Sequence, residues 1–342
     1  GWCNGHTVKQ GRNMNFKIDG FVLSIIAVIG IAYIFPQWGT ADSRVPIDTI
    51  SAIGISLIFF FYGLKLSPSK LKAGLKNWKL HLLVQASTFL IFPLIVLAFY
   101  PLVQNSEQQT LWLAFFFLAA LPSTVSSSVV MVSMAKGNIP AAIFNASISG
   151  IIGILITPLW MGPFVQETGT DFDFTVIYSK LILQIILPVI LGLFLQRFLG
   201  ILAQKYNSYL SLFDKSIILL IIYKSFAESF EENIFGVVSF LDLGILFVAV
   251  LGLFYVAFFL TGFVAKKLRF NTEDQITAQF CGTKKSLVHG TVFSKILFGN
   301  MASIGIILLP LMIFHATQIL ILSIIAGIRA TRPDEGESIV EA

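Results

Sequence analysis

Residues 277–291 read TAQFCGTKKSLVHGT, and they place Lys284 and Lys285 side by side in an otherwise apolar part of the chain. The segment around them, about residues 275–298, is long enough to cross a membrane as a helix, which takes roughly 20 residues. A charged side chain in the middle of such a helix costs ~3 kcal/mol and is usually functional. The role of the two ammonium groups therefore depends on the class of protein that carries them.

The composition identifies that class. Of the 342 residues, 56% are hydrophobic and 12% are charged, and the mean hydropathy is +0.84, whereas soluble domains carry roughly 25% charged residues. A soluble fold of this size could not bury so much apolar surface. The apolar runs are continuous rather than alternating, which excludes a membrane β-barrel. The sequence therefore predicts an all-α polytopic membrane protein.

Ten apolar segments are predicted to span the membrane, at 18–36, 46–66, 79–100, 110–136, 139–165, 174–197, 212–230, 241–265, 275–298 and 302–328. Lys and Arg gather in alternate loops and at both termini, whereas the other loops carry only Arg44 and are otherwise acidic. Since Lys and Arg stay on the cytoplasmic side, we expect a multi-pass protein of the cell membrane with both termini in the cytoplasm. Residues 1–17 and 329–342 are predicted to be tails.

Two of the ten segments are predicted to be broken helices. In the fourth, Pro122 interrupts the helix, and hydroxyl side chains that could cap a second helix follow it. An ordinary proline kink, with hydroxyls bonded within the helix, is the alternative. In the ninth, Gly282 can end one helix, and Thr283 or Ser286 can cap the next. Breaks in the fourth and ninth segments predict two five-helix repeats of opposite topology, residues 18–165 and 174–328, with a transporter's binding site at the breaks.

Several stretches carry a resemblance to a known family: WKLHLLVQASTFLIFPL (78–94), LPSTVSSSVVM (121–131), GNIPAAIFNASISGIIGILITP (137–158), IIYKSFAESF (221–230), FCGTKKSLVHG (280–290) and LPLMIFHATQIL (309–320). The chain resembles the bile acid:sodium symporter superfamily, most closely the SBF-like branch of sodium/bile acid cotransporter 7 and its bacterial relatives. The resemblance implies a panel domain of helices 1, 2, 6 and 7, a core domain of helices 3–5 and 8–10, and a binding site where helices 4 and 9 cross.

The sodium ligands that the resemblance implies are partly missing from this chain. Phe280 stands where sodium-coupled members have Glu, and Lys284 stands where they have a following Gln. Asn145 and Gln85 remain as polar partners. Sodium coupling is therefore doubtful, no cofactor is expected, and proton coupling is an alternative because a lysine buried in a membrane can release its proton.

Two interpretations of the lysines stay open. Both could be structural and cap backbone carbonyls, or one could occupy the place of sodium while the other faces the substrate. We expect Lys284 to be the sodium substitute, with Lys285 as the alternative. The candidate substrate- or ion-binding residues are Thr124, Ser126, Ser127, Ser128, Asn145, Gln85, Gln279, Thr283, Lys284, Lys285, Ser286, His289, His315 and Gln318.

The predicted function is secondary active transport of a small organic anion by alternating access. The expected partners are this anion and the lipid bilayer, without nucleic acid, in a monomer or homodimer. Since the sequence holds no HExxH, G-x-S-x-G, P-loop or dinucleotide-binding motif, no enzyme activity is expected. The resemblance also leaves open a membrane regulator of calcium homeostasis that does not transport.

Overall fold

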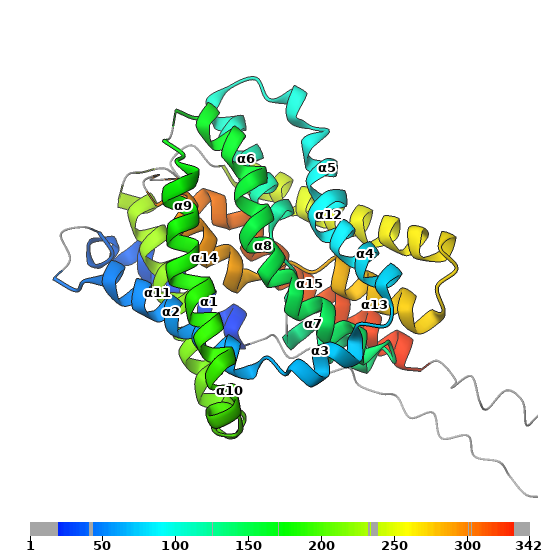
Figure 1. Cartoon of the computed structure of the whole chain (residues 1–342). Coiled ribbons are helices and arrows are strands. Elements are labelled where there is room, and N and C mark those ends of the chain that lie inside the picture. The colour runs from blue at the N-terminus through cyan, green and yellow to red at the C-terminus, as the bar shows by residue number, and fades with distance from the viewer. Residues whose placement is uncertain are drawn as a thin grey trace, which may run out of the picture.

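The computed structural model of the protein describes residues 20–40, 44–124, 126–169, 171–231, 233, 239–299, 301 and 303–331. These residues form helices and connecting turns without any strand (Figure 1), so the all-α prediction is confirmed. The predicted tail 1–17 and most of the tail 329–342 lie outside the described residues.

The N-terminal part of the chain contains α1 (Gly20–Ile34), η1 (Pro36–Trp38), α2 (Ile47–Lys65), α3 (Pro68–Gly74), α4 (Trp78–Ala86), the π-helical turn η2 (Ser87–Ile91), α5 (Phe92–Leu97), η3 (Tyr100–Leu102), α6 (Ser106–Ala120), α7 (Ser126–Met134) and α8 (Ile139–Glu167). The C-terminal part contains α9 (Phe174–Leu181), the π-helical turn η4 (Ile182–Ile186), α10 (Leu187–Lys205), α11 (Asn207–Glu231), α12 (Phe240–Lys267), α13 (Thr272–Gly282), α14 (Leu287–Leu297) and α15 (Ile304–Ala330).

Six helices or continuous helical runs of the described chain are long and apolar enough to cross a membrane: Ile47–Lys65, Trp78–Leu102, Ile139–Glu167, Phe174–Lys205, Phe240–Lys267 and Ile304–Ala330. Apolar side chains on the outside of the bundle agree with a lipid environment; Phe194 and Ile201 of α10 are 70% and 83% exposed. The chain is therefore a multi-pass membrane protein. The count of ten spans stays a prediction, because α1, α6, α7, α13 and α14 are short and α11 carries several charges.

The helices pack in two groups. In the first group, α2 packs against α10 and α11, and α1 packs against α11. In the second group, α6 packs against α8 and α15, and α13 packs against α4, α7 and α12. Helix α11 also contacts α14 and α15, so it lies where the first group meets the second.

Helices α2 and α10 approach so closely that only glycine fits at their crossing. A Cβ atom on Gly63 would lie 2.2 Å from the Val189 carbonyl oxygen, and one on Gly192 would lie 2.1 Å from the Phe60 carbonyl oxygen. Both obstacles are backbone atoms, which cannot rotate away as a side chain can. Small residues commonly allow this kind of close helix contact in membranes.

We expect Gly192→Ala to destabilise the protein, because the new methyl group must push α10 away from α2. Overpacking typically costs about 1–3 kcal/mol, and the melting temperature should fall by at least ~2 °C. Gly252→Ala in α12 is the matched control, since nothing lies within 4 Å of a Cβ at that glycine. Thermal unfolding of the purified protein in detergent measures both changes, and an equal response of the two variants would contradict the close-approach explanation.

Candidate substrate and ion site

Two non-helical segments meet inside the second group of helices. Helix α6 ends at Ala120 and α7 begins at Ser126, while α13 ends at Gly282 and α14 begins at Leu287. The Ser286 N–H donates to the Pro122 carbonyl at 2.9 Å, and the Ser123 hydroxyl donates to the Cys281 carbonyl at 2.7 Å. The segments at 121–124 and 281–286, far apart in sequence, therefore lie in direct contact.

Side chains satisfy many of the backbone groups that the helix ends leave without a partner. The Ala120 carbonyl accepts from Thr157 at 2.7 Å, and the Gly282 carbonyl accepts from Ser87 at 3.0 Å. At the start of α14, the Ser286 hydroxyl caps the helix by accepting from the His289 N–H at 3.2 Å. Such compensation is what allows irregular backbone at membrane depth, and it supplies a physical reason for the hydroxyl-rich sequence near each break.

Lys285 is fully buried and directs its ammonium group at three backbone carbonyls. Its Nζ atom donates to the carbonyls of Thr88 at 2.8 Å, Ala119 at 2.7 Å and Leu121 at 2.9 Å. The ring of Phe92 lies 4.2 Å from Nζ and adds a cation–π contact. An ammonium group has three donors, so each of them has one carbonyl. This carbonyl set also has the chemistry that binds a small metal cation.

The sequence explains why these three carbonyls are available. Ala119 and Leu121 lie at the C-terminal end of α6, where carbonyls have no partner in the helix. Thr88 lies in the π-helical turn η2, in which its carbonyl would pair with the amide five residues later. That residue is Pro93, which has no N–H. Lys285 thus supplies the donors that two interrupted helices lack.

Gln318 of α15 fixes the backbone of Lys285. Its Oε1 atom accepts from the Lys285 N–H at 2.9 Å, and its Nε2 atom donates to the Lys285 carbonyl at 2.9 Å. Gln318 is fully buried. One amide side chain thus satisfies both backbone groups of a residue that belongs to no helix, and it holds Lys285 in place.

Lys284 is also fully buried, but its surroundings are poorer in acceptors. Its Nζ atom donates to the Ser127 hydroxyl at 2.7 Å and contacts the Met131 sulfur at 3.6 Å. No Asp or Glu among the described residues forms an ion pair with Lys284 or Lys285. The positive charge of Lys284 is therefore not balanced by a protein carboxylate in this part of the chain.

Hydroxyl groups connect Lys284 to a cavity. Thr124 Oγ1 lies 2.9 Å from Ser127 Oγ and 2.8 Å from Ser128 Oγ, and Thr124 and Ser127 both line the cavity. The side chain of Ser126 lies outside the described residues. The three described hydroxyls and Lys284 form one hydrogen-bonded cluster at the N-terminal end of α7.

The cavity has a volume of about 470 Å³ and lies between the two groups of helices. The first group contributes the second half of α2 and the first half of α11, from Ile58 to Leu66 and from Asn207 to Ile218. The second group contributes residues 286–289 at the start of α14, together with Ser147 and His315. The walls are mostly apolar, while the hydroxyl groups and the α14 N-terminus supply polar groups near the breaks.

The structure separates three of the candidate residues from this cavity. Asn145 and Gln85 form a cluster with His81: the Gln85 amide donates to Asn145 Oδ1 at 3.1 Å, and Asn145 Nδ2 lies 2.8 Å from His81 Nδ1. Gln279 instead contacts the Phe258 carbonyl at 3.1 Å and the Arg329 guanidinium at 2.6 Å. None of the three lines the cavity.

The other candidates lie at or beside the two breaks. His289 and His315 line the cavity, and His289 Nδ1 lies 2.9 Å from the Ser286 hydroxyl. Thr283 directly follows α13, and its hydroxyl donates to the Gln279 carbonyl at 2.5 Å. Phe280 packs against Phe258, with ring centroids 6.3 Å apart, and does not line the cavity.

Sequence reasoning did not identify Tyr62 as part of this region. Its hydroxyl donates to the Ser147 carbonyl at 2.6 Å and joins α2 to α8 beside the cavity. One tyrosine in an apolar helix carries no sequence signal for a contact 85 residues away.

A comparison with protein families matches residues 19–330 to the SBF-like CPA transporter family. The chain belongs to this family. Similar relatives include an uncharacterized protein of Pseudomonas aeruginosa, 38% identical over 94% of this chain and 95% of the relative. "Putative symporter YfeH" of Escherichia coli is 34% identical over 90% and 92% of the two chains. "Sodium/bile acid cotransporter 7" of Rattus norvegicus is 30% identical over 92% and 97%.

Membership in the SBF-like CPA transporter family confirms the resemblance found in the sequence. Two relatives carry the names "Putative symporter YfeH" and "Sodium/bile acid cotransporter 7", and the family is one of transporters, so the chain belongs with membrane transporters and not with enzymes. A transporter of this kind handles a small molecule within a bilayer.

Proposed function

We propose that this protein is a secondary active transporter of a small organic anion and that it works by alternating access. The observation that carries the proposal is the buried Lys284 ammonium, held by Ser127 at 2.7 Å, beside a cavity that Ser127 itself lines. A buried positive charge without a protein carboxylate favours an anionic ligand nearby. The N-terminus of α14, which also lines the cavity, likewise favours a negatively charged ligand.

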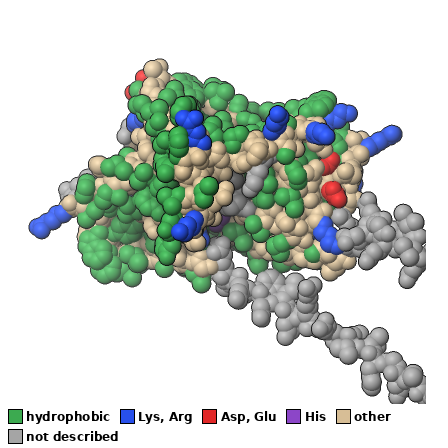
Figure 2. All heavy atoms as spheres, turned by 60° about the horizontal axis from the view of Figure 1, so that its bottom comes forward, with side chains coloured by type: hydrophobic (Ala, Val, Ile, Leu, Met, Phe, Trp, Pro, Cys, Tyr) green, Lys and Arg blue, Asp and Glu red, His purple; other side chains and the backbone are tan. Residues whose placement is uncertain are grey.

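The wider architecture that fits this function is a ten-span inverted repeat. The breaks that follow Ala120 and Gly282 would interrupt helices 4 and 9, and the first and second groups of helices would act as panel and core. The cavity between the groups suits a carrier in which one group moves against the other. Both termini would be cytoplasmic, which fits the basic surface seen in Figure 2, where Lys and Arg side chains are widespread and few Asp and Glu are visible.

We also propose that transport does not depend on sodium. Lys285 directs a cation at three carbonyls that could otherwise bind a metal ion. Two unit charges 4 Å apart repel by ~4 kcal/mol at an effective dielectric of 20, which lowers affinity roughly a thousandfold. A sodium ion would therefore not share this site with a charged lysine. In this proposal Lys285 is the sodium substitute, Lys284 faces the anion, and transport is either proton-coupled or uncoupled.

Replacing sodium by choline is expected to leave the activity of the wild-type protein within about twofold of its original value, because the cation site already holds an ammonium group. Purified protein is reconstituted in liposomes, and uptake of a panel of organic anions is measured with each cation at two pH values. A tenfold loss on removal of sodium, restored by its return, would overturn sodium independence. Specific binding of an anion without flux would favour a regulator over a transporter.

A further inference from the structure

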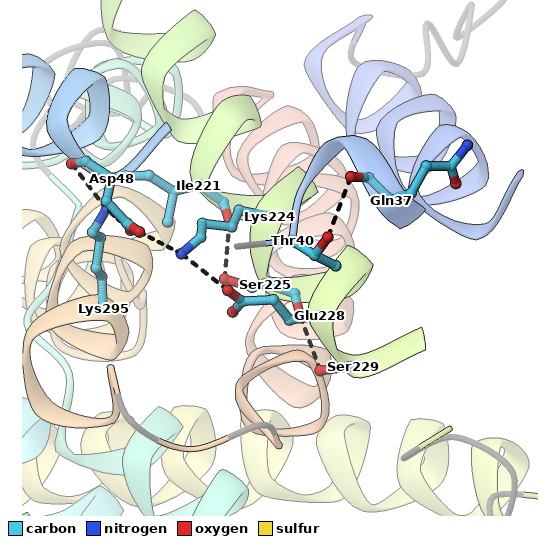
Figure 3. Close-up of polar contacts among 9 residues, drawn as sticks. All are labelled: Gln37, Thr40, Asp48, Ile221, Lys224, Ser225, Glu228, Ser229 and Lys295. Carbon is cyan, nitrogen blue, oxygen red and sulfur yellow. Dashed lines mark hydrogen bonds and ion pairs between the residues drawn. The ribbon is translucent and has the colours of Figure 1, made fainter. Parts of the chain in front are cut away.

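Four charged side chains lie together at one end of α2, and we call them the outer ion cluster: Asp48, Lys224, Glu228 and Lys295. Asp48 is central (Figure 3): its Oδ1 atom lies 3.0 Å from Lys295 Nζ and its Oδ2 atom lies 2.8 Å from Lys224 Nζ. Lys224 also pairs with Glu228, one turn along the same helix, at 3.0 Å.

The ion pairs of this cluster differ in whether they connect the two groups of helices or lie within one group. Asp48 belongs to α2 and Lys224 to α11, which are both in the first group of helices. Lys295 belongs to α14 in the second group and lies in the last turn of that helix. The Asp48–Lys295 pair therefore connects the two groups, whereas the Lys224–Glu228 pair lies within one helix.

The cluster and the cavity lie at opposite ends of the same helices. On α2, the cavity is lined by Ile58 to Leu66, and Asp48 lies about 25 Å from Lys65 along the helix axis at ~1.5 Å per residue. On α11, the cavity is lined by residues from Asn207 to Ile218, and Lys224 lies beyond them. The outer ion cluster therefore joins the two groups of helices at the ends of the α2 and α11 stretches that lie away from the cavity.

The carboxylate of Asp48 balances the charges of both lysines in the cluster. The side chains of Lys224 and Lys295 are only 19% and 22% exposed, whereas that of Asp48 is 68% exposed. Without the carboxylate, two mostly buried ammonium groups would repel each other across the contact between the groups. Because Asp48 itself is exposed to water, it can also leave Lys295 without the large desolvation changes of a buried pair.

We propose that the outer ion cluster is the gate that closes the cavity on the Asp48 side, and that the Asp48–Lys295 pair separates when the cavity opens to that side. The inference rests on the proposed alternating access. It assigns the closed state to a reversible contact between charges, the ion pair that joins Asp48 of α2 to Lys295 of α14.

The test measures access to the cavity without any substrate. Val288, which lines the cavity, is replaced by cysteine in a chain whose Cys3 and Cys281 are changed to serine and alanine. Vesicles are treated with a membrane-impermeant maleimide from the side that Arg44 faces, and Arg44→Cys labelling verifies the orientation. Asp48→Asn and Lys295→Met should each raise the labelling rate of position 288 at least fivefold, which corresponds to ~1 kcal/mol.

The matched control is Glu228→Gln, which removes a charge from the cluster but leaves the Asp48–Lys295 pair intact, and it should change labelling less than twofold. The exchange variant Asp48→Lys/Lys295→Glu restores a pair between the groups and should lower the labelling rate below that of either single variant, which also shows that the chain folds; repulsion between the new ammonium group and Lys224 keeps the recovery partial. Unchanged labelling in Asp48→Asn and Lys295→Met, or an equal rise in Glu228→Gln, would overturn the gate. A rise in labelling in a protein that transports no anion would instead count against the proposed function alone.

Discussion

Replacing Lys285 by methionine is expected to unfold or inactivate the protein: the melting temperature should fall by at least ~5 °C and uptake by more than about a hundredfold. The variant keeps the volume of the side chain but leaves the carbonyls of Thr88, Ala119 and Leu121 without their donor. Each buried polar group that loses its partner costs about 1–3 kcal/mol, and three are affected at once. Thermal unfolding and liposome uptake measure the two effects.

Sodium provides a sharper test of the same site. Lys285→Ala vacates the space among the three carbonyls, and sodium at about 0.1 M is then expected to raise the melting temperature of this variant, because a ligand that binds only the folded state stabilises it. The wild-type protein should show no such response, and choline should stabilise neither. Lys180→Ala, at an exposed position of α9, controls for the loss of a lysine. A sodium response as strong in the wild-type protein would contradict the assignment of Lys285.

Lys284→Met is expected to have a different effect: anion affinity should fall at least about a hundredfold, while the melting temperature should stay unchanged or rise. Lys284 has one hydroxyl acceptor and a weak sulfur contact, so it recovers little of the cost of burying an ammonium group. A methionine avoids that cost and removes the charge that attracts the ligand. Binding of the anions found by uptake, measured by calorimetry, checks the first effect.

The Ser127→Ala variant separates charge from hydrogen bonding at this site. It removes the hydroxyl that Lys284 binds but keeps the ammonium group, so we expect a loss of anion affinity of about tenfold and a measurable loss of stability. If Lys284→Met lowered the melting temperature as much as Lys285→Met while anion binding persisted, Lys284 would be a structural residue.

The sequence predicts the class of the protein and the positions of both helix breaks because these depend on local chemistry. Pro122 lacks a backbone donor, Gly282 and Ser286 end and cap helices, and long apolar runs need a bilayer. Helix α6 ends at Ala120 and α13 ends at Gly282, close to the residues expected to interrupt a helix, while the prediction that each helix pair is one broken membrane span stays a prediction. The all-α class and the family can be predicted without knowing which helices contact each other.

The partners of individual side chains could not be predicted in the same way. Consecutive residues on an extended segment point in different directions, so the sequence cannot decide which of Lys284 and Lys285 lies among the carbonyls. The carbonyl of Thr88 becomes available only because η2 is π-helical and Pro93 lies five residues on. Gln318 has no signature that distinguishes a ligand of a substrate from a partner of the Lys285 backbone. These contacts depend on how helices distant in sequence pack.

The contact between residues 121–123 and 281–286 also has a consequence for the order in which the protein is made. Chains fold during synthesis from the N-terminus onward, so α6 is made before residues 283–286 have been translated. Until Lys285 arrives, the carbonyls of Ala119 and Leu121 lack the donors they have in the finished protein, and a buried carbonyl without a donor is costly. The first half of the chain is therefore an incomplete folding unit, and its final packing must wait for the second half to be inserted.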